Sequence, residues 1–114
     1  MRKLRWSTEL EAIAQRWADQ CRVEHFRGSD DTLDGGLVGE NLAVSWSSER
    51  QSEDKVQAEA VSSAQNWYSE VNKPGFGRKS AGRYVFNSGT AHYTQLVWAD
   101  TEELGCGMVH YTVQ

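Results

Sequence analysis

The stretch Ala91-His92-Tyr93-Thr94-Gln95-Leu96-Val97-Trp98 decides how this chain is interpreted. It places a histidine between a Gly/Ser/Thr turn, residues 87–90, and an apolar run that ends at Trp98. An imidazole at the rim of an apolar segment can titrate near neutral pH and can bind a metal. The run is short, so its periodicity is compatible with either a helical turn or a strand.

Size and composition indicate a folded chain of one domain. It has 114 residues, of which 39% are hydrophobic, and five are Trp. A chain of this length can bury one core without surplus. The net charge of −4 argues against duplex nucleic acid and against an anionic membrane surface as partners. No apolar run approaches the roughly 20 residues that a transmembrane helix needs.

Two amphipathic helices are expected. The first covers residues 7–26, with Ser7 as its N-cap and His25 continuing its inner stripe near the C-terminus. The second covers residues 53–71 and is capped by Ser52, with Glu70 at the edge of its inner stripe. The apolar stripes consist of Leu10, Ile13, Ala14, Trp17, Ala18 and Cys21 in the first helix, and Val56, Ala60, Ala64, Trp67 and Val71 in the second.

The remaining chain is predicted to be mostly loop. Residues 73–90 are rich in Gly and Ser and form a long loop, which is typical of a functional segment. Residues 107–113 are predicted to form a strand with an exposed edge.

Several short motifs in one order resemble the CAP superfamily, which comprises cysteine-rich secretory proteins, venom allergens and plant pathogenesis-related proteins. The resemblance runs from about Leu4 to Tyr111. Its motifs are Trp17-Ala18-Asp19-Gln20-Cys21 with His25, Gly39-Glu40-Asn41-Leu42, Trp67-Tyr68-Ser69-Glu70, His92-Tyr93-Thr94-Gln95 and Leu104-Gly105-Cys106-Gly107.

The resemblance implies an α/β (α+β) fold, the CAP-like α-β-α sandwich, with helices packed on a small, mostly antiparallel sheet. Relatives usually carry a signal sequence and a first helix before the equivalent of Leu4, and a final strand after the equivalent of Tyr111. We therefore expect residues 1–114 to be a single, incomplete CAP domain of a secreted, extracellular protein.

The resemblance also implies a cleft lined by four residues, His25, Glu40, Glu70 and His92. Two imidazoles, His25 and His92, can bind zinc or another divalent cation and leave positions open for water. The two carboxylates can orient the imidazoles or accept a proton, so they are the candidate catalytic residues. The alternative is a hydrogen-bonded network with a structural role. Ala91 stands where most relatives have Gly, and a requirement for positive φ there would displace His92.

The two cysteines allow two further interpretations. In relatives the equivalents of Cys21 and Cys106 pair with cysteines outside this chain, so we expect both to lack their partners; a Cys21–Cys106 bridge is the alternative. Cys21-x-x-x-His25 and Cys106-x-x-x-His110 also give four ligands at repeated spacing, a rival structural zinc set.

Function divides into three hypotheses. The first is a secreted binding or effector protein whose loop takes a sterol or another lipid through Pro74, Phe76, Tyr84 and Phe86, as the corresponding loop does in some CAP proteins. The alternative for these side chains is a lid packed over the core. The second hypothesis is a metal- or His/Glu-dependent hydrolase that uses the same cleft. The third is a venom-allergen-like ligand of an extracellular protein receptor, with a vestigial cleft. The residues favour binding over catalysis, because no independent hydrolase motif is present.

Overall fold

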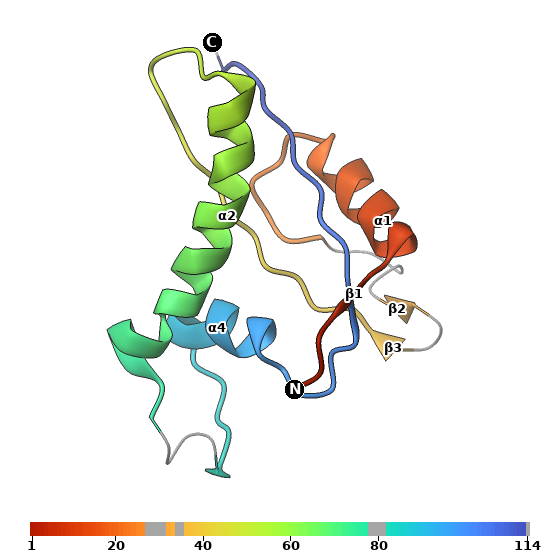
Figure 1. Cartoon of the computed structure of the whole chain (residues 1–114), viewed down its shortest axis with the longest axis vertical. Helices are drawn as coiled ribbons and strands as arrows, with labels where there is room; N and C mark the ends of the chain where they lie inside the picture. Colours follow the sequence, from red (N-terminus) through yellow and green to blue (C-terminus); the bar gives the residue numbers. More distant parts are fainter. Residues whose placement is uncertain (27–31, 34–35, 78–81, 114) are drawn as a thin grey trace. The chain divides into compact units, whose positions relative to one another are not determined.

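The computed structural model describes residues 1–26, 32–33, 36–77 and 82–113 (Figure 1). The chain combines helices with small pieces of sheet, and it divides into two compact units. One unit comprises Met1–Leu42 with Trp98–Gln114, and the other comprises Ala43–Val97. The assignment of residues 1–114 to a single domain stays a prediction.

The helix of the first unit, α1 (Thr8–Ala18), begins where the sequence predicts. Ser7 caps it, because the Ser7 Oγ accepts a hydrogen bond from the backbone N–H of Leu10 at 3.1 Å. Glu9 and Glu11 lie in the first turn, where negative charge is favourable. The predicted inner stripe is half-buried from Leu10 to Ala18, whereas the glutamates are exposed.

The end of α1 differs from the prediction. The helix stops at Ala18 rather than near Phe26, because Cys21 takes a left-handed backbone conformation with φ of 56°. Beyond this reversal the Trp17 indole donates to the Glu24 carbonyl at 2.9 Å, which holds the chain against the helix. His25 therefore lies in a non-helical segment and does not continue the helical stripe.

Short strands complete the first unit. β1 (Arg5–Trp6) pairs in parallel with β4 (Glu103–Leu104), and β2 (Thr32–Leu33) pairs antiparallel with β3 (Gly36–Leu37). The predicted mostly antiparallel sheet is thus replaced, over the described residues, by one parallel and one antiparallel pair.

Residues 107–113 do not form the predicted strand in the part of the chain that the structure describes. The side-chain amide of Gln15 instead takes both backbone groups of Met108: it donates to the carbonyl at 2.9 Å and accepts from the N–H at 3.2 Å. A helix side chain thus occupies the groups that a neighbouring strand would otherwise bind.

The long helix of the second unit, α2 (Glu53–Ser69), matches its prediction closely. Ser52 caps it by accepting from the Lys55 N–H at 3.3 Å. Ala60, placed on the inner stripe by the pattern, is exposed. An irregular turn, η1 (Val71–Gly75), follows directly, and it ends at Gly75, whose φ of 107° suits glycine.

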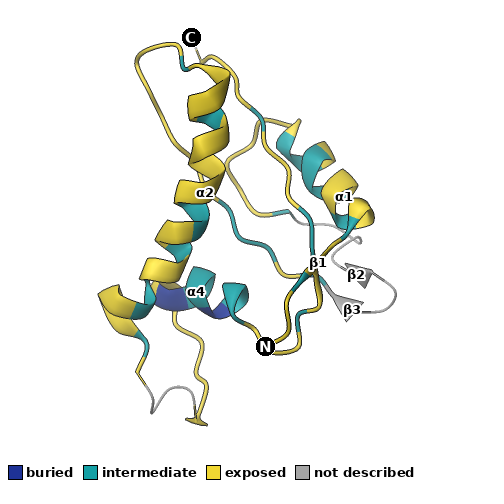
Figure 2. Cartoon of the chain, in the orientation of Figure 1, coloured by how far each residue is buried: buried dark blue, intermediate teal, exposed yellow. Residues whose placement is uncertain are grey.

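The segment around His92 is helical. A short turn, η2 (Ser88–Thr90), leads into α4 (Ala91–Leu96), so the helical alternative is the observed one. Asn87 supports the entry, because its side-chain oxygen accepts from the Gly89 N–H at 2.8 Å. Thr90 and Thr94 are buried, with 3% and 7% of their surface exposed, and they are dark blue in Figure 2.

Apolar burial is limited in this chain. Among the described residues no hydrophobic side chain is fully buried, and the large exposed ones include Trp46 and Phe86, each at 69%. No helix in the described ranges is long and apolar enough to cross a membrane.

Candidate functional site: two histidine–glutamate clamps

The first pair consists of His25 and Glu40, both in the first unit. The ring Nδ1 of His25 lies 2.5 Å from Glu40 Oε1, and the same oxygen accepts a hydrogen bond from the Phe26 N–H at 3.0 Å. Phe26 in turn packs edge-on against Trp17, with ring centroids 5.3 Å apart. The non-helical segment after α1 is therefore tied to Glu40 by its histidine side chain and by its backbone.

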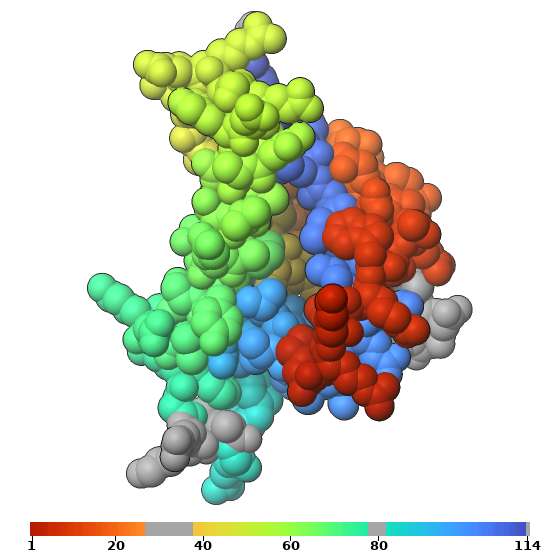
Figure 3. Space-filling view, in the orientation of Figure 1, coloured from red at the N-terminus to blue at the C-terminus, as the bar shows by residue number. Residues whose placement is uncertain are grey.

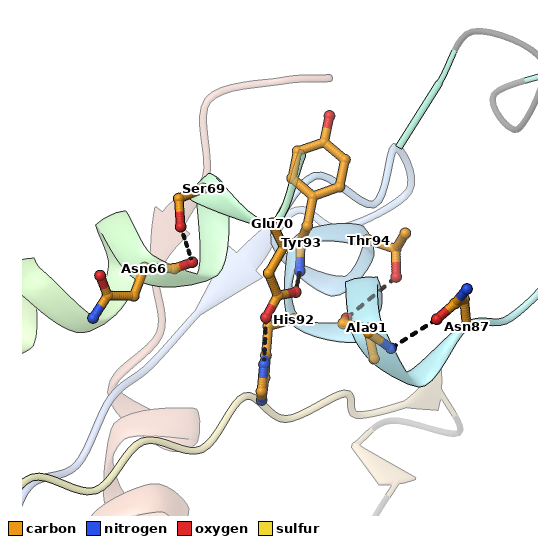
Figure 4. A network of polar contacts seen from close by, with 9 residues as sticks. Asn66, Ser69, Glu70, Asn87, Ala91, His92, Tyr93 and Thr94 are labelled. Atoms are coloured by element: carbon orange, nitrogen blue, oxygen red, sulfur yellow. Dashed lines mark hydrogen bonds and ion pairs between the residues drawn. The ribbon is translucent and has the colours of Figure 1, made fainter. Parts of the chain in front are cut away.

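The second pair consists of Glu70 and His92, both in the second unit (Figure 4). The ring Nδ1 of His92 lies 2.9 Å from Glu70 Oε2, and Glu70 Oε1 accepts from the Tyr93 N–H at 2.9 Å. The His92 ring stacks on Trp67 at 6.0 Å. Glu70 is the C-cap of α2 and His92 is the second residue of α4, so this carboxylate joins the two helices.

The two pairs follow one pattern, which we call a clamp. In each, a glutamate binds the Nδ1 of a histidine and the backbone N–H of the aromatic residue that follows it, as in His25-Phe26 and His92-Tyr93. Because an ionised carboxylate only accepts hydrogen bonds, a neutral imidazole held this way carries its proton on Nδ1. The acceptor lone pair then lies on Nε2, the nitrogen that a metal or a proton donor would use.

Burial distinguishes the pairs. The side chains of His92 and Glu70 are 35% and 19% exposed, whereas those of His25 and Glu40 are 57% and 31% exposed. Water weakens a charged hydrogen bond that it can reach, so the Glu70–His92 pair contributes more to the rigidity of its unit.

Alanine at position 91 does not disturb the second pair. Its φ is −65° and its ψ is −38°, an ordinary right-handed helical conformation. The displacement of His92 that a positive φ would have caused is therefore not observed.

Metal binding by His25 and His92 stays a prediction. Over the described residues, no group of three or more His, Cys, Asp or Glu side chains is placed to hold a metal ion. The rival zinc set also loses its basis, because Cys21 and His25 do not share a helical face once α1 ends at Ala18. Cys21 and Cys106 are both free thiols, so the Cys21–Cys106 bridge is not formed.

The expected lipid loop has two kinds of side chain. Phe76 packs on Tyr93 with ring centroids 5.5 Å apart, which fits the lid interpretation. Tyr84 and Phe86 are 44% and 69% exposed, so at these positions the lid interpretation is wrong. Pro74 is exposed and lies beside Gly89, where an added Cβ would be 3.1 Å from the proline ring.

Sequence reasoning missed the backbone half of each clamp. Neither Phe26 nor Tyr93 was expected to take part, because a backbone N–H has no residue signature. The available signal was that both site histidines are followed directly by an aromatic residue.

Comparison with known proteins places the chain in a family. The model of the cysteine-rich secretory protein family, CAP, matches residues 1–114, so the chain belongs to that family. It is 39% identical to venom allergen 5 of Microctonus hyperodae, over 95% of this chain and 44% of that protein. It is 34% identical to venom allergen 5 of Vespula flavopilosa, over 97% of this chain and 50% of that protein. It is 36% identical to human cysteine-rich secretory protein 2, over 96% of this chain and 40% of that protein. The chain spans about half the length of the curated relatives that it matches. No solved structure matches it.

Proposed function

We propose that the chain belongs to an extracellular CAP binding or effector protein with the α-β-α sandwich of its family. In this proposal His25, Glu40, Glu70 and His92 line one cleft, and the two histidines hold a divalent cation such as zinc. The observation that carries the proposal is the repeated clamp, in which each glutamate fixes the ring orientation of its histidine. The names of the relatives, venom allergen and cysteine-rich secretory protein, support an extracellular location.

The donor set fits a metal. A carboxylate on Nδ1 is the usual partner that fixes the tautomer of a zinc-binding histidine and makes its other nitrogen more basic. Two imidazoles would leave positions for water, which a bound cation would polarise. Glu40 and Glu70 orient the rings in this arrangement, and each is already bonded to a backbone N–H.

A calorimetric zinc titration tests the cleft. We expect saturable binding to the wild type, loss of binding in His25→Ala/His92→Ala, and unchanged binding in His110→Ala, which removes an exposed histidine outside the clamps. Circular dichroism establishes that each variant is folded. A folded wild type without saturable zinc binding would contradict the metal site.

The loop supplies the second part of the proposal, a site for a sterol or another lipid. Exposed Tyr84 and Phe86, together with Pro74, offer apolar surface of a kind that suits a small lipid. Binding of detergent-dispersed cholesterol should be saturable, should survive His92→Ala and should fail in Phe76→Ser/Phe86→Ser. Sterol binding that persists in the folded loop variant would contradict this part.

Hydrolysis is the second candidate, because each imidazole lies beside a carboxylate. It predicts turnover of ester or peptide substrates that Glu40→Gln abolishes. The engagement of both carboxylates with backbone N–H groups favours an orienting role instead. A ligand for a protein receptor, the third possibility, predicts a biological effect that neither the clamp nor the loop variants alter.

A further inference from the structure

The charges of the chain are strongly segregated. Between Glu70 and Asp100 there is no acidic residue, while Lys73, Arg78, Lys79 and Arg83 are basic. Residues 71–99 therefore carry four positive charges, and the rest of the chain carries 16 negative and eight positive charges, in agreement with the total of −4. The whole-chain balance, which argued against an anionic surface as a partner, conceals this positive segment.

Hydrophobic side chains are exposed next to the described basic ones. Tyr84, Val85 and Phe86 are 44%, 72% and 69% exposed, and they directly follow Arg83, which is also exposed. Lys73, which is in η1 and precedes Arg83 by ten positions, is exposed as well. Figure 3 shows the cyan residues that follow position 82 at the surface of the molecule, and Figure 2 colours the same part of the chain as exposed.

Most acidic residues of the same unit lie too far from Lys73 and Arg83 to cancel much of their positive charge. Glu49 precedes α2, and Glu53, Asp54 and Glu59 are in its N-terminal half, whereas η1 starts after its C-terminal end. Glu59, the nearest of them, lies ten residues before the last residue of α2, which is about 15 Å along the helix and roughly twice the ~8 Å screening length at physiological ionic strength. The nearest acid, Glu70, is committed to His92 and Tyr93.

From these observations we propose that the surface formed by Lys73, Arg83, Tyr84, Val85 and Phe86 docks the protein on an anionic phospholipid bilayer. The basic side chains bind the headgroup layer, and Val85 and Phe86 insert below it. Interfacial binding requires exposed apolar side chains flanked by Lys and Arg, because neither apolar insertion nor electrostatic attraction alone gives stable attachment. The proposal extends the proposed lipid site of the loop, because it names the membrane from which a lipid would be taken. It rests on that part of the proposed function only in that both use the same loop.

Vesicle co-sedimentation tests the proposal with the full chain. Vesicles of phosphatidylcholine that also contain phosphatidylserine are compared with vesicles of phosphatidylcholine alone, both without sterol. We expect at least tenfold stronger binding to the anionic vesicles, because each basic residue near such a surface strengthens binding roughly fivefold. Binding should weaken as NaCl is raised.

Two pairs of matched variants identify the surface. Lys73→Gln/Arg83→Gln and Val85→Ser/Phe86→Ser should each reduce binding by about tenfold or more. Their controls remove the same kinds of side chain from exposed positions elsewhere in the unit: Arg50→Gln/Lys55→Gln, and Val61→Ser with Trp46→Ser. Circular dichroism verifies that all four are folded.

Several results would overturn the proposal. These are equal binding to both kinds of vesicle, and control variants that weaken binding as much as the test variants. Binding that needs the charges but not Val85 and Phe86 would also overturn it, because it would show electrostatic adsorption without insertion. Failure of the proposed sterol site is distinguished separately, because sterol binding is measured in detergent without vesicles and bilayer docking is measured without sterol.

Discussion

Glu70 holds His92 through the ring Nδ1 at 2.9 Å, although 22 positions separate them in the sequence. The same carboxylate accepts the N–H of Tyr93, the third residue of α4. Thr90, the N-cap of α4, provides no side-chain cap of its own. Glu70 therefore supplies from α2 the acceptor that an N-cap side chain would supply locally, and it orients the histidine in the same step.

The first prediction concerns the free energy of unfolding. Glu70→Gln removes the charged acceptor of His92, and we expect a loss of about 1–3 kcal/mol, measured by urea unfolding. Glu40→Gln should cost less, because the side chains of Glu40 and His25 are 31% and 57% exposed and those of Glu70 and His92 only 19% and 35%. A Glu40→Gln cost equal to or above that of Glu70→Gln would contradict the difference in burial between the two clamps.

The sequence predicted those parts of the molecule that local rules determine. The Ser7 and Ser52 caps and the start of both helices are confirmed, because a cap and a 3.6-residue period are short-range signals. The family assignment is also confirmed. The predicted end of α1 was wrong. Periodicity encodes neither the left-handed conformation of Cys21, where the chain reverses, nor the contact between Trp17 and the Glu24 carbonyl beyond it.

Tertiary pairings account for the other differences. Residues 107–113 have the composition of a strand, but Gln15 takes the backbone groups of Met108, and that pairing spans 93 positions. The same applies to the clamps. Family motifs identified the four side chains, whereas the backbone N–H groups of Phe26 and Tyr93 became visible only in three dimensions.

The second prediction follows from two glycines that lie against α1. An added Cβ at Gly105 would lie 2.2 Å from the Glu11 backbone nitrogen, and one at Gly107 would lie 2.5 Å from that of Gln15. Backbone cannot yield as a side-chain tip can, so we expect Gly105→Ala and Gly107→Ala each to lower the free energy of unfolding by about 1–3 kcal/mol or more. Gly77→Ala is the matched control, because nothing lies within 4 Å of its added Cβ. Equal stability of all three variants would refute this packing.

The third prediction concerns the Cys106 thiol. Partial burial raises the pKa of Cys106, and the negative charge of Glu11 raises that pKa further. Less thiolate is then present near pH 8, so alkylation of Cys106 by iodoacetamide should be slow and should accelerate in Glu11→Gln, while Glu9→Gln leaves it unchanged. The folded state binds this proton more tightly than the unfolded state does. The free energy of unfolding should therefore fall as pH rises above the ordinary cysteine pKa, and this thiol should not affect it at lower pH. Unchanged alkylation in Glu11→Gln would rule out the influence of Glu11.

The fourth prediction concerns the stability of the chain alone. No hydrophobic residue in the described part is fully buried, and side chains as large as Trp6, Trp46 and Trp98 are 53%, 69% and 45% exposed. Burial of apolar surface is the main favourable term in folding, so residues 1–114 should unfold at low temperature with a broad transition. A longer protein that adds flanking chain to reach the length of the curated relatives, about twice that of residues 1–114, should cover part of this surface and melt at least several degrees higher. Differential scanning calorimetry measures both transitions. An unchanged melting temperature in the longer protein would mean that the exposed tryptophans are not covered by the added chain, and that their surface is kept open for a partner.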